Sequence, residues 1–161
     1  MTRDTGRTGL RIETVTGEDM LEEWRHVHNV IVPPAAMTPD EARDRQERYR
    51  LANAYLDGVL VGCSTVRPPR DGAATVIARV LPPYRRQGIG TALYEDGLRH
   101  ARVRGARTVE TCVLAANTDG LRFALARGFT ETDRYTLDGE SDQWIDLRLA
   151  PPHAQSLATR A

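Results

Sequence analysis

The fold of this chain is decided by the stretch Arg85-Arg86-Gln87-Gly88-Ile89-Gly90-Thr91, which joins an apolar, strand-like run to an amphipathic segment. The glycines let the backbone approach a ligand closely, and the amides of a first helical turn have no acceptor within the helix. The positive end of the helix dipole favours an anion at the same point. The stretch therefore predicts a phosphate-binding turn, to which Arg85 and Arg86 add positive charge.

Two common phosphate-binding motifs do not fit this turn. A P-loop requires lysine followed by serine or threonine after its last glycine, and a dinucleotide-binding fingerprint requires a third glycine where Leu93 stands. The spacing that fits is Arg/Gln-x-x-Gly-x-Gly, which begins at Arg85 and is preceded by Val80-Leu81-Pro82-Pro83-Tyr84.

This spacing resembles the acyl-CoA-binding motif of the Gcn5-related N-acetyltransferase (GNAT) family, and the resemblance extends from about Arg11 to Leu149. It implies the α/β fold of that family, in which a mixed central β-sheet of about seven strands is flanked by about four helices. In that family the strand before the glycine turn diverges from the next parallel strand, and the pantetheine arm of the co-substrate lies between them. Such a gap would separate Val80 from Thr111 and Val113.

The resemblance also implies which groups bind acetyl-CoA, the expected co-substrate, with no metal ion. Backbone groups of Val80 and Leu81 would bond the pantetheine amides. The pyrophosphate would be held by backbone amides of Arg85, Arg86, Gln87, Gly88, Ile89, Gly90 and Thr91.

A second signature of the family, Asn-x-x-Ala/Ser-x-x-Phe/Leu-Tyr-x-x-x-Gly-Phe, is similar to the stretch from Asn117 to Phe129. Asn117 would bond near the pantetheine or the pyrophosphate arm, although it could instead serve only as a helix cap. The resemblance breaks at Ala124, where the family commonly carries a tyrosine that protonates the departing thiolate. It breaks again at Cys112, where ribosomal-protein N-terminal acetyltransferases carry a glutamate base.

A base is needed because an alkyl amine with a pKa near 10.4 has only about one free molecule in 2,500 at pH 7. Glu110 is the candidate base, since period-two alternation places it on the same strand face as Cys112. It could also be a solvated carboxylate at the start of the strand. Tyr135 is the candidate acid if its hydroxyl points into the gap, the alternative being ordinary packing.

Acceptor recognition in this family generally comes from the connection between the first two helices, here residues 29–38, and from the final hairpin, here residues 138–142. The resemblance implies an N-acetyltransferase that acts on a primary amine by direct attack in a ternary complex. A small-molecule acceptor is our first expectation and a protein N-terminus the second. Two alternatives stay open: a catalytically silent acyl-CoA-binding module that acts through a partner, and a site for another nucleotide such as ATP.

Periodicity and capping residues predict the remaining elements. Strands are expected over residues 10–15, 52–56, 59–66, 73–81, 108–114, 129–137 and 144–149, and helices over 17–31, 38–50, 88–104 and 117–127. The clearest start signal is Thr38-Pro39-Asp40-Glu41, a capping box with proline at the first helical position. Pro68-Pro69 is expected to end a strand. Residues 10–150 are expected to form one domain between flexible segments at 1–9 and 151–161.

Composition limits the other function classes. The chain of 161 residues carries 22 basic and 22 acidic side chains and no net charge, which gives no reason to expect nucleic acid or membrane as a partner. Cys63 and Cys112 lack the spacing of a disulfide framework or zinc site, and His26 and His28 would point to different helix faces. We see no secretion signal or long apolar run, so a cytoplasmic location is expected. The apolar end of the final strand could pair across a homodimer.

Overall fold

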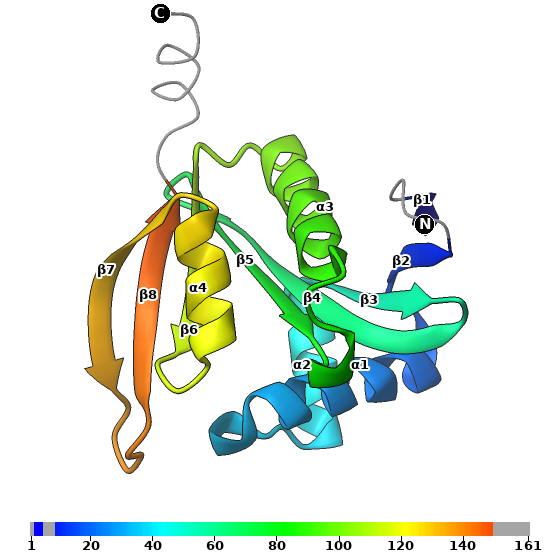
Figure 1. Ribbon diagram of the computed structural model, residues 1–161, viewed down its shortest axis with the longest axis horizontal. Coiled ribbons are helices and arrows are strands. Elements are labelled where there is room, and N and C mark those ends of the chain that lie inside the picture. Colours follow the sequence, from blue (N-terminus) through cyan, green and yellow to red (C-terminus); the bar gives the residue numbers. More distant parts are fainter. Residues whose placement is uncertain (1, 5–8, 150–161) are drawn as a thin grey trace, which may run out of the picture.

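The computed structural model describes residues 2–4 and 9–149, which form one eight-stranded mixed sheet in the order β1-β2-β3-β4-β5-β6-β8-β7. The strands are β1 (Thr2–Asp4), β2 (Leu10–Thr14), β3 (Arg50–Leu56), β4 (Val59–Arg70), β5 (Ala73–Val80), β6 (Thr108–Leu114), β7 (Phe129–Thr136) and β8 (Gln143–Leu149). The helices are α1 (Gly17–Ile31), α2 (Pro39–Arg48), α3 (Ile89–Val103) and α4 (Thr118–Ala126), with short 3₁₀ turns at Pro33–Ala35 and Pro82–Tyr84. Figure 1 shows their arrangement.

The predicted mixed sheet with four helices is confirmed, and the order of strands and helices along the chain is the one expected, apart from an additional short strand. That strand is β1, which pairs antiparallel with β2 and lies inside the N-terminal segment for which we expected flexibility. The tail at 151–161 lies outside the described residues, so its expected flexibility stays a prediction.

The helices cover opposite faces of the sheet because neighbouring strand residues point to opposite sides. Leu51 packs in a cluster with Trp24 of α1, whereas the next residue, Ala52, packs with Leu93 of α3. Helix α3 approaches β5 so closely that a Cβ atom on Gly97 would lie 2.5 Å from a methyl carbon of Val76. The sheet therefore lies between two apolar layers, one formed with α1 and α2 and the other with α3 and α4.

Strand β4 continues through the prolines that were expected to end it. The register between β4 and β5 shifts between Arg67 and Arg70, so Pro68 and Pro69 lie in a bulge. Proline has no amide to donate to a ladder, and a bulge is one of the few places where a strand tolerates it. The strand then returns through Asp71-Gly72, where both residues have positive φ.

The predicted capping box opens α2 as expected. The Glu41 amide donates to the Thr38 hydroxyl at 3.2 Å, and the Thr38 amide donates to the Glu41 carboxylate at 3.3 Å. Both contacts satisfy amides that the first helical turn leaves without partners.

The final strand is not at an edge of the sheet, so the expected route to a homodimer through β8 is wrong. Strand β8 pairs with β6 on one side and with β7 on the other. Within the described residues, the edges belong to β1 and β7. None of the helices in this part of the chain combines the length and the apolar character that a membrane crossing requires.

Candidate active site

Strands β5 and β6 lie side by side over only three residue pairs, which run from Ala73 with Thr108 to Thr75 with Glu110. Beyond this point β5 stays paired with β4, whereas β6 stays paired with β8. The two strands therefore diverge toward their carboxyl ends (Figure 1). A pocket of about 410 Å³ occupies the gap, and Val80, Thr111 and Val113 line it as expected.

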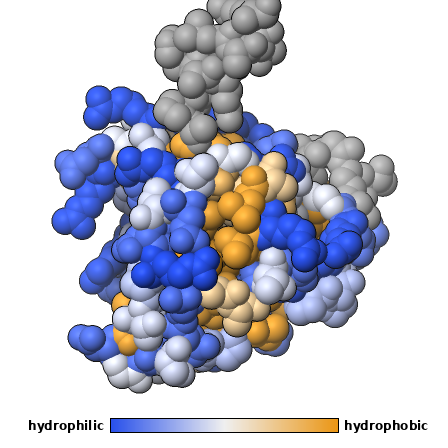
Figure 2. Space-filling model, turned by 60° about the vertical axis from the view of Figure 1, so that its left-hand side comes forward, coloured by the Kyte–Doolittle hydropathy of each residue, from blue (hydrophilic) through white to orange (hydrophobic). Residues whose placement is uncertain are grey.

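The pocket passes from one face of the sheet to the other. On the α3 and α4 side it is lined by Tyr94, Phe123, Ala124 and Phe129, and on the α1 side by Ile31, Val32, Arg79, Cys112, Leu114 and Trp144. Figure 2 turns the α4 and β6–β8 side of the molecule forward and shows a band of hydrophobic side chains bordered by hydrophilic ones. A ligand of mixed apolar and charged character suits such a pocket.

The glycine turn lies at one end of the pocket and opens α3. Gly88 is the residue before the helix and has a φ of 81°, a left-handed conformation that glycine adopts without strain. The first intrahelical bond joins the Ala92 amide to the Gly88 carbonyl, so the amides of the first turn have no partner within the helix. Of the residues predicted to bind the co-substrate, those that line the pocket are Val80, Arg85, Arg86, Gly88, Ile89, Gly90, Thr91 and Asn117.

Two of the predicted binding residues, Leu81 and Gln87, are not part of the pocket wall. The backbone groups expected to meet the pantetheine arm are also engaged. The Leu81 amide donates to the Val61 carbonyl at 2.9 Å, and the Val80 carbonyl accepts a bond from Nε of Arg85 at 3.1 Å. Arg85 also pairs with Asp119 of α4 at 3.1 Å.

Asn117 caps α4 and also lies in the pocket wall. Its side-chain oxygen accepts a bond from the Gly120 amide at 3.0 Å and caps α4. The same residue lines the pocket, so capping does not remove it from the site.

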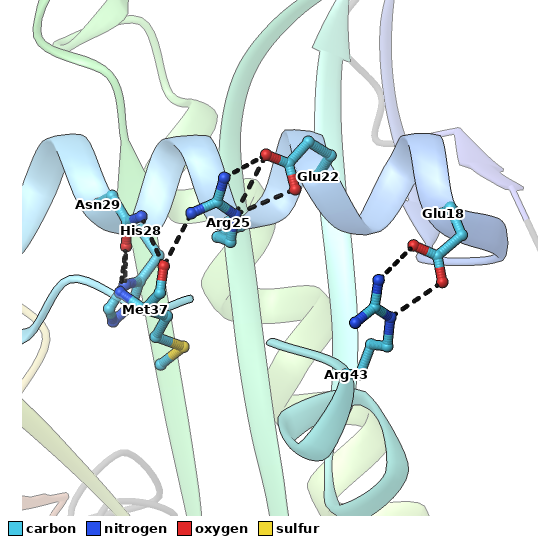
Figure 3. A network of polar contacts seen from close by, with 7 residues as sticks. All are labelled: Glu18, Glu22, Arg25, His28, Asn29, Met37 and Arg43. Atoms are coloured by element: carbon cyan, nitrogen blue, oxygen red, sulfur yellow. Dashed lines mark hydrogen bonds and ion pairs between the residues drawn. The ribbon is translucent and has the colours of Figure 1, made fainter. Parts of the chain in front are cut away.

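The connection between α1 and α2 is fixed to α1 by polar contacts (Figure 3). The Met37 carbonyl accepts bonds from Arg25 at 2.8 Å and from Asn29 at 3.1 Å, and the Met37 amide donates to Asn29 at 2.8 Å. Within this predicted acceptor-binding segment, Ile31 and Val32 line the pocket. No residue of the other predicted segment, 138–142, does so.

A comparison with protein-family models matches residues 17–129 to the acetyltransferase (GNAT) family. The chain belongs to the GNAT family. This stretch contains the glycine turn, the diverging strands and the stretch from Asn117 to Phe129, so the resemblance seen in the sequence is confirmed. Among curated proteins, no sequence matches this one.

Solved structures of GNAT enzymes share the fold. Naa50 of Arabidopsis thaliana, in complex with the bisubstrate analogue CoA-Ac-MVNAL, has 22% identity and a TM-score of 0.72. The match covers 89% of this chain and 99% of that chain. The ribosomal-protein-S18-alanine N-acetyltransferase of Escherichia coli has 22% identity and a TM-score of 0.70 over 87% and 92%. A GNAT family acetyltransferase of Elizabethkingia anophelis with acetyl-CoA bound has 17% identity and a TM-score of 0.67 over 89% and 99%.

The structure does not bring Glu110 or Tyr135 to the wall of the GNAT pocket. Glu110 lies where β5 and β6 are still paired, and its carboxylate forms an ion pair with Arg148 at 2.5 Å. The Tyr135 hydroxyl donates to Asp146 at 2.9 Å instead of pointing into the gap. Burial and the Asp146 contact hold the pKa of Tyr135 above its usual range, so this phenol keeps its proton.

Asp146 is a functional candidate that the sequence reasoning missed. It lies directly opposite Cys112 in the ladder between β6 and β8, and side chains opposite one another in a ladder share a face. Burial raises the pKa of the Cys112 thiol, and the negative charge of Asp146 acts in the same direction. Cys112 itself is therefore a neutral thiol in the pocket wall, next to a carboxylate.

Tyr94 of α3 is a second residue that the sequence reasoning missed. It lines the pocket beside Ala124, and its hydroxyl is buried with no hydrogen-bond partner in the part of the chain that the structure describes. Burial raises the pKa of Tyr94 to about 12. Among the described residues, no three His, Cys, Asp or Glu side chains gather as a metal-binding group.

Proposed function

We propose that this protein transfers the acetyl group of acetyl-CoA to a primary amine by direct attack in a ternary complex. The observation that carries the proposal is the divergence of β5 and β6 around a pocket with the first turn of α3 at one end. An anion-binding helix end and a narrow, largely apolar channel suit the two parts of a CoA molecule, its pyrophosphate and its pantetheine arm.

The pyrophosphate would lie against the first-turn amides of α3, with Arg86 and Arg85 adding charge. The pantetheine arm would follow β5, where Arg85 now holds the Val80 carbonyl. On binding, Arg85 would exchange that carbonyl for a phosphate oxygen and leave the carbonyl to a pantetheine amide. The acetyl-CoA and bisubstrate complexes of the two structural neighbours support acetyl-CoA as the co-substrate.

The amine nitrogen would attack the thioester carbonyl carbon, after which the carbon–sulfur bond breaks and CoA leaves as a thiolate. We assign Asp146, in place of Glu110, as the proton acceptor for the amine, through a water molecule, because it faces Cys112. The thiolate would take a proton from solvent, since Ala124 offers none. The first acceptor class is a small-molecule amine and the second a protein N-terminus, as in the Escherichia coli neighbour.

A catalytically silent acyl-CoA-binding module is the second candidate function. It is favoured by one observation: the pocket wall carries Ala124 and Cys112 at the positions where the resemblance implied a tyrosine and a glutamate.

Mass spectrometry of products from acetyl-CoA and a broad amine panel separates the two functions. Acetylated product and free CoA in equal amounts would support the transferase. Saturable acetyl-CoA binding without product from any amine would support the silent module.

A further inference from the structure

On the α1 side of the pocket, which we call the acceptor end, the guanidinium of Arg79 has no anion to pair with among the described residues. Arg79 of β5 lies opposite Cys63 in the ladder with β4, and Cys63 belongs to the apolar cluster under α1. The Arg79 side chain therefore points to the α1 face, where it also lines the pocket. Within the described residues, its guanidinium makes no hydrogen bond or ion pair.

Arg67 adds a second charge on the same face. It stands four residues along β4 from Cys63, and residues of a strand two or four apart share a face. Its guanidinium carbon lies 5.3 Å from the centre of the Tyr49 ring, and its Nε is buried without a hydrogen-bond partner in the described chain. The positive charges of Arg67 and Arg45 both act on Arg79.

The neighbouring carboxylates are occupied elsewhere. Asp146 accepts the Tyr135 hydroxyl, and Glu41 accepts the Thr38 amide at the start of α2. Arg79 is half-buried in the pocket wall, and burial lowers its pKa. A desolvated guanidinium is costly unless an anion pairs with it, and Arg is the side chain best suited to bind a carboxylate by two parallel hydrogen bonds.

The opposite wall carries the complementary charge. Asp146 lies across from Cys112, and the charges of Arg79, Arg67 and Asp146 all act on that thiol. Arg79 therefore lines the pocket on the β5 side, and Asp146 faces Cys112 of the lining from β8, whereas Arg67 and Asp146 are not themselves part of that lining. This arrangement fits a molecule with an ammonium group at one end and an anion at the other.

We infer that the acceptor is a small amine that also carries a carboxylate or an equivalent anion, which Arg79 binds with support from Arg67 while the amine faces Asp146. This inference rests on the proposed acetyl transfer and narrows its substrate class. The other predicted acceptor-recognition segment, residues 138–142, contributes no residue to the pocket lining.

The test compares ω-amino carboxylates of increasing chain length, each with the alkylamine of the same length, and adds a peptide whose C-terminus is amidated. Values of kcat/KM are measured at saturating acetyl-CoA for the natural protein, Arg79→Gln and Arg70→Gln. Arg70 is a matched control because it is an exposed arginine of β4 outside the pocket. Thermal unfolding of each variant checks that it is folded.

We expect one chain length of amino carboxylate to exceed its alkylamine by about 10- to 100-fold, the range that a hydrogen bond to a charged group supplies. Arg79→Gln should remove this preference through KM, and Arg70→Gln should leave both the preference and the alkylamine activity unchanged. Preference for alkylamines or for the amidated peptide overturns the inference. So does an equal loss on both members of a pair.

If acetyl-CoA binds but no amine is acetylated, the anion site is tested by calorimetric titration instead. Each amino carboxylate and the alkylamine of the same length are titrated into the complex of the protein with CoA. Binding of an amino carboxylate but not of its alkylamine supports the anion site, and equal or absent binding overturns it. Failure of the proposed acetyl transfer has a different signature: acetyl-CoA is then not consumed with any amine, whereas failure of this inference leaves acetylation intact and removes only the preference for amino carboxylates.

Discussion

Arg85 and Asp119 form an ion pair, with Nη1 of the arginine 3.1 Å from a carboxylate oxygen, that joins the turn after β5 to the first turn of α4. Both residues line the pocket, and Arg85 also holds the Val80 carbonyl. Arg85 therefore engages, through this pair and the Val80 carbonyl, groups that our proposal assigns to acetyl-CoA binding.

Replacing Asp119 by asparagine should strengthen acetyl-CoA binding. A partly exposed ion pair contributes about 0.2–1 kcal/mol, so its loss should lower the dissociation constant by up to about fivefold. Calorimetric titration measures the change. Asp138→Asn removes the same charge from the exposed β7–β8 turn and should not change the dissociation constant. Weaker acetyl-CoA binding by Asp119→Asn would show that the ion pair helps to form the site and does not compete with the ligand for Arg85.

Asp146→Asn should lower kcat by at least about 100-fold while acetyl-CoA affinity stays unchanged, because general bases contribute about 10²- to 10⁴-fold. Steady-state kinetics with a saturating amine measure this. Glu110→Gln is the matched control, since the Glu110 carboxylate pairs with Arg148. A large loss in Glu110→Gln with normal Asp146→Asn activity would return the role of base to Glu110.

The stability of the fold should decrease in mild acid because of His28. Burial, followed by the charge of Arg79, lowers the pKa of His28 from 6.5 to about 4. The unfolded chain then binds a proton between these pH values and the folded chain does not, so stability is present above pH 6.5 and is lost as the pH falls toward 4. Between pH 7.5 and pH 5 we expect this residue to account for about 2 kcal/mol.

Urea unfolding of His28→Gln at both pH values measures this contribution. The variant should lose less stability on acidification than the natural protein, whereas His26→Gln should behave like the natural protein because His26 is exposed. An identical pH dependence in all three proteins would mean that His28 is protonated in the folded state.

The buried ion pair between Arg50 of β3 and Asp96 of α3 should be important for stability. Its atoms are 2.6 Å apart, and the Asp96 side chain is 0% exposed. Asp96→Asn leaves a guanidinium without its counter-charge and should cost about 3–5 kcal/mol in urea unfolding. Glu18→Gln breaks the exposed pair with Arg43 and should cost at most about 1 kcal/mol.

Local signals in the sequence predicted most of the fold. The capping box at Thr38 and the glycine turn at Gly88 each depend on neighbouring residues, and both helices begin where these signals place them. The continuation of β4 past Pro68 was not predictable, because the bulge that accommodates the prolines is set by pairing with β5.

The site was predicted less completely because its chemistry depends on contacts between distant strands. Alternation correctly placed Glu110 and Cys112 on one face, but it could not show that Arg148 pairs with Glu110. Asp146 comes 34 positions after Cys112 in the numbering and meets it only through the β6–β8 ladder, so no local pattern marks it. The lack of a partner for Arg79 is likewise a property of the packed molecule.

The central claim is that the pocket between β5 and β6 binds acetyl-CoA. The most direct test is the melting temperature with and without acetyl-CoA, with ATP for comparison and with the variant Gly90→Ala. A Cβ atom on Gly90 would make only ordinary contacts, the nearest at 3.5 Å from Val80, so this variant should fold. Its added methyl group nevertheless lies in the pocket wall, in the helical turn that our proposal assigns to the pyrophosphate.

At 100 times the dissociation constant, acetyl-CoA should stabilise the natural protein by about 2.7 kcal/mol, which corresponds to roughly 5–10 °C. ATP should give no comparable shift. Gly90→Ala should melt no lower than the natural protein, because alanine favours a helix over glycine. Its melting temperature should nevertheless rise less with acetyl-CoA. The absence of a shift at saturating acetyl-CoA, or an equal shift with ATP, would contradict the account.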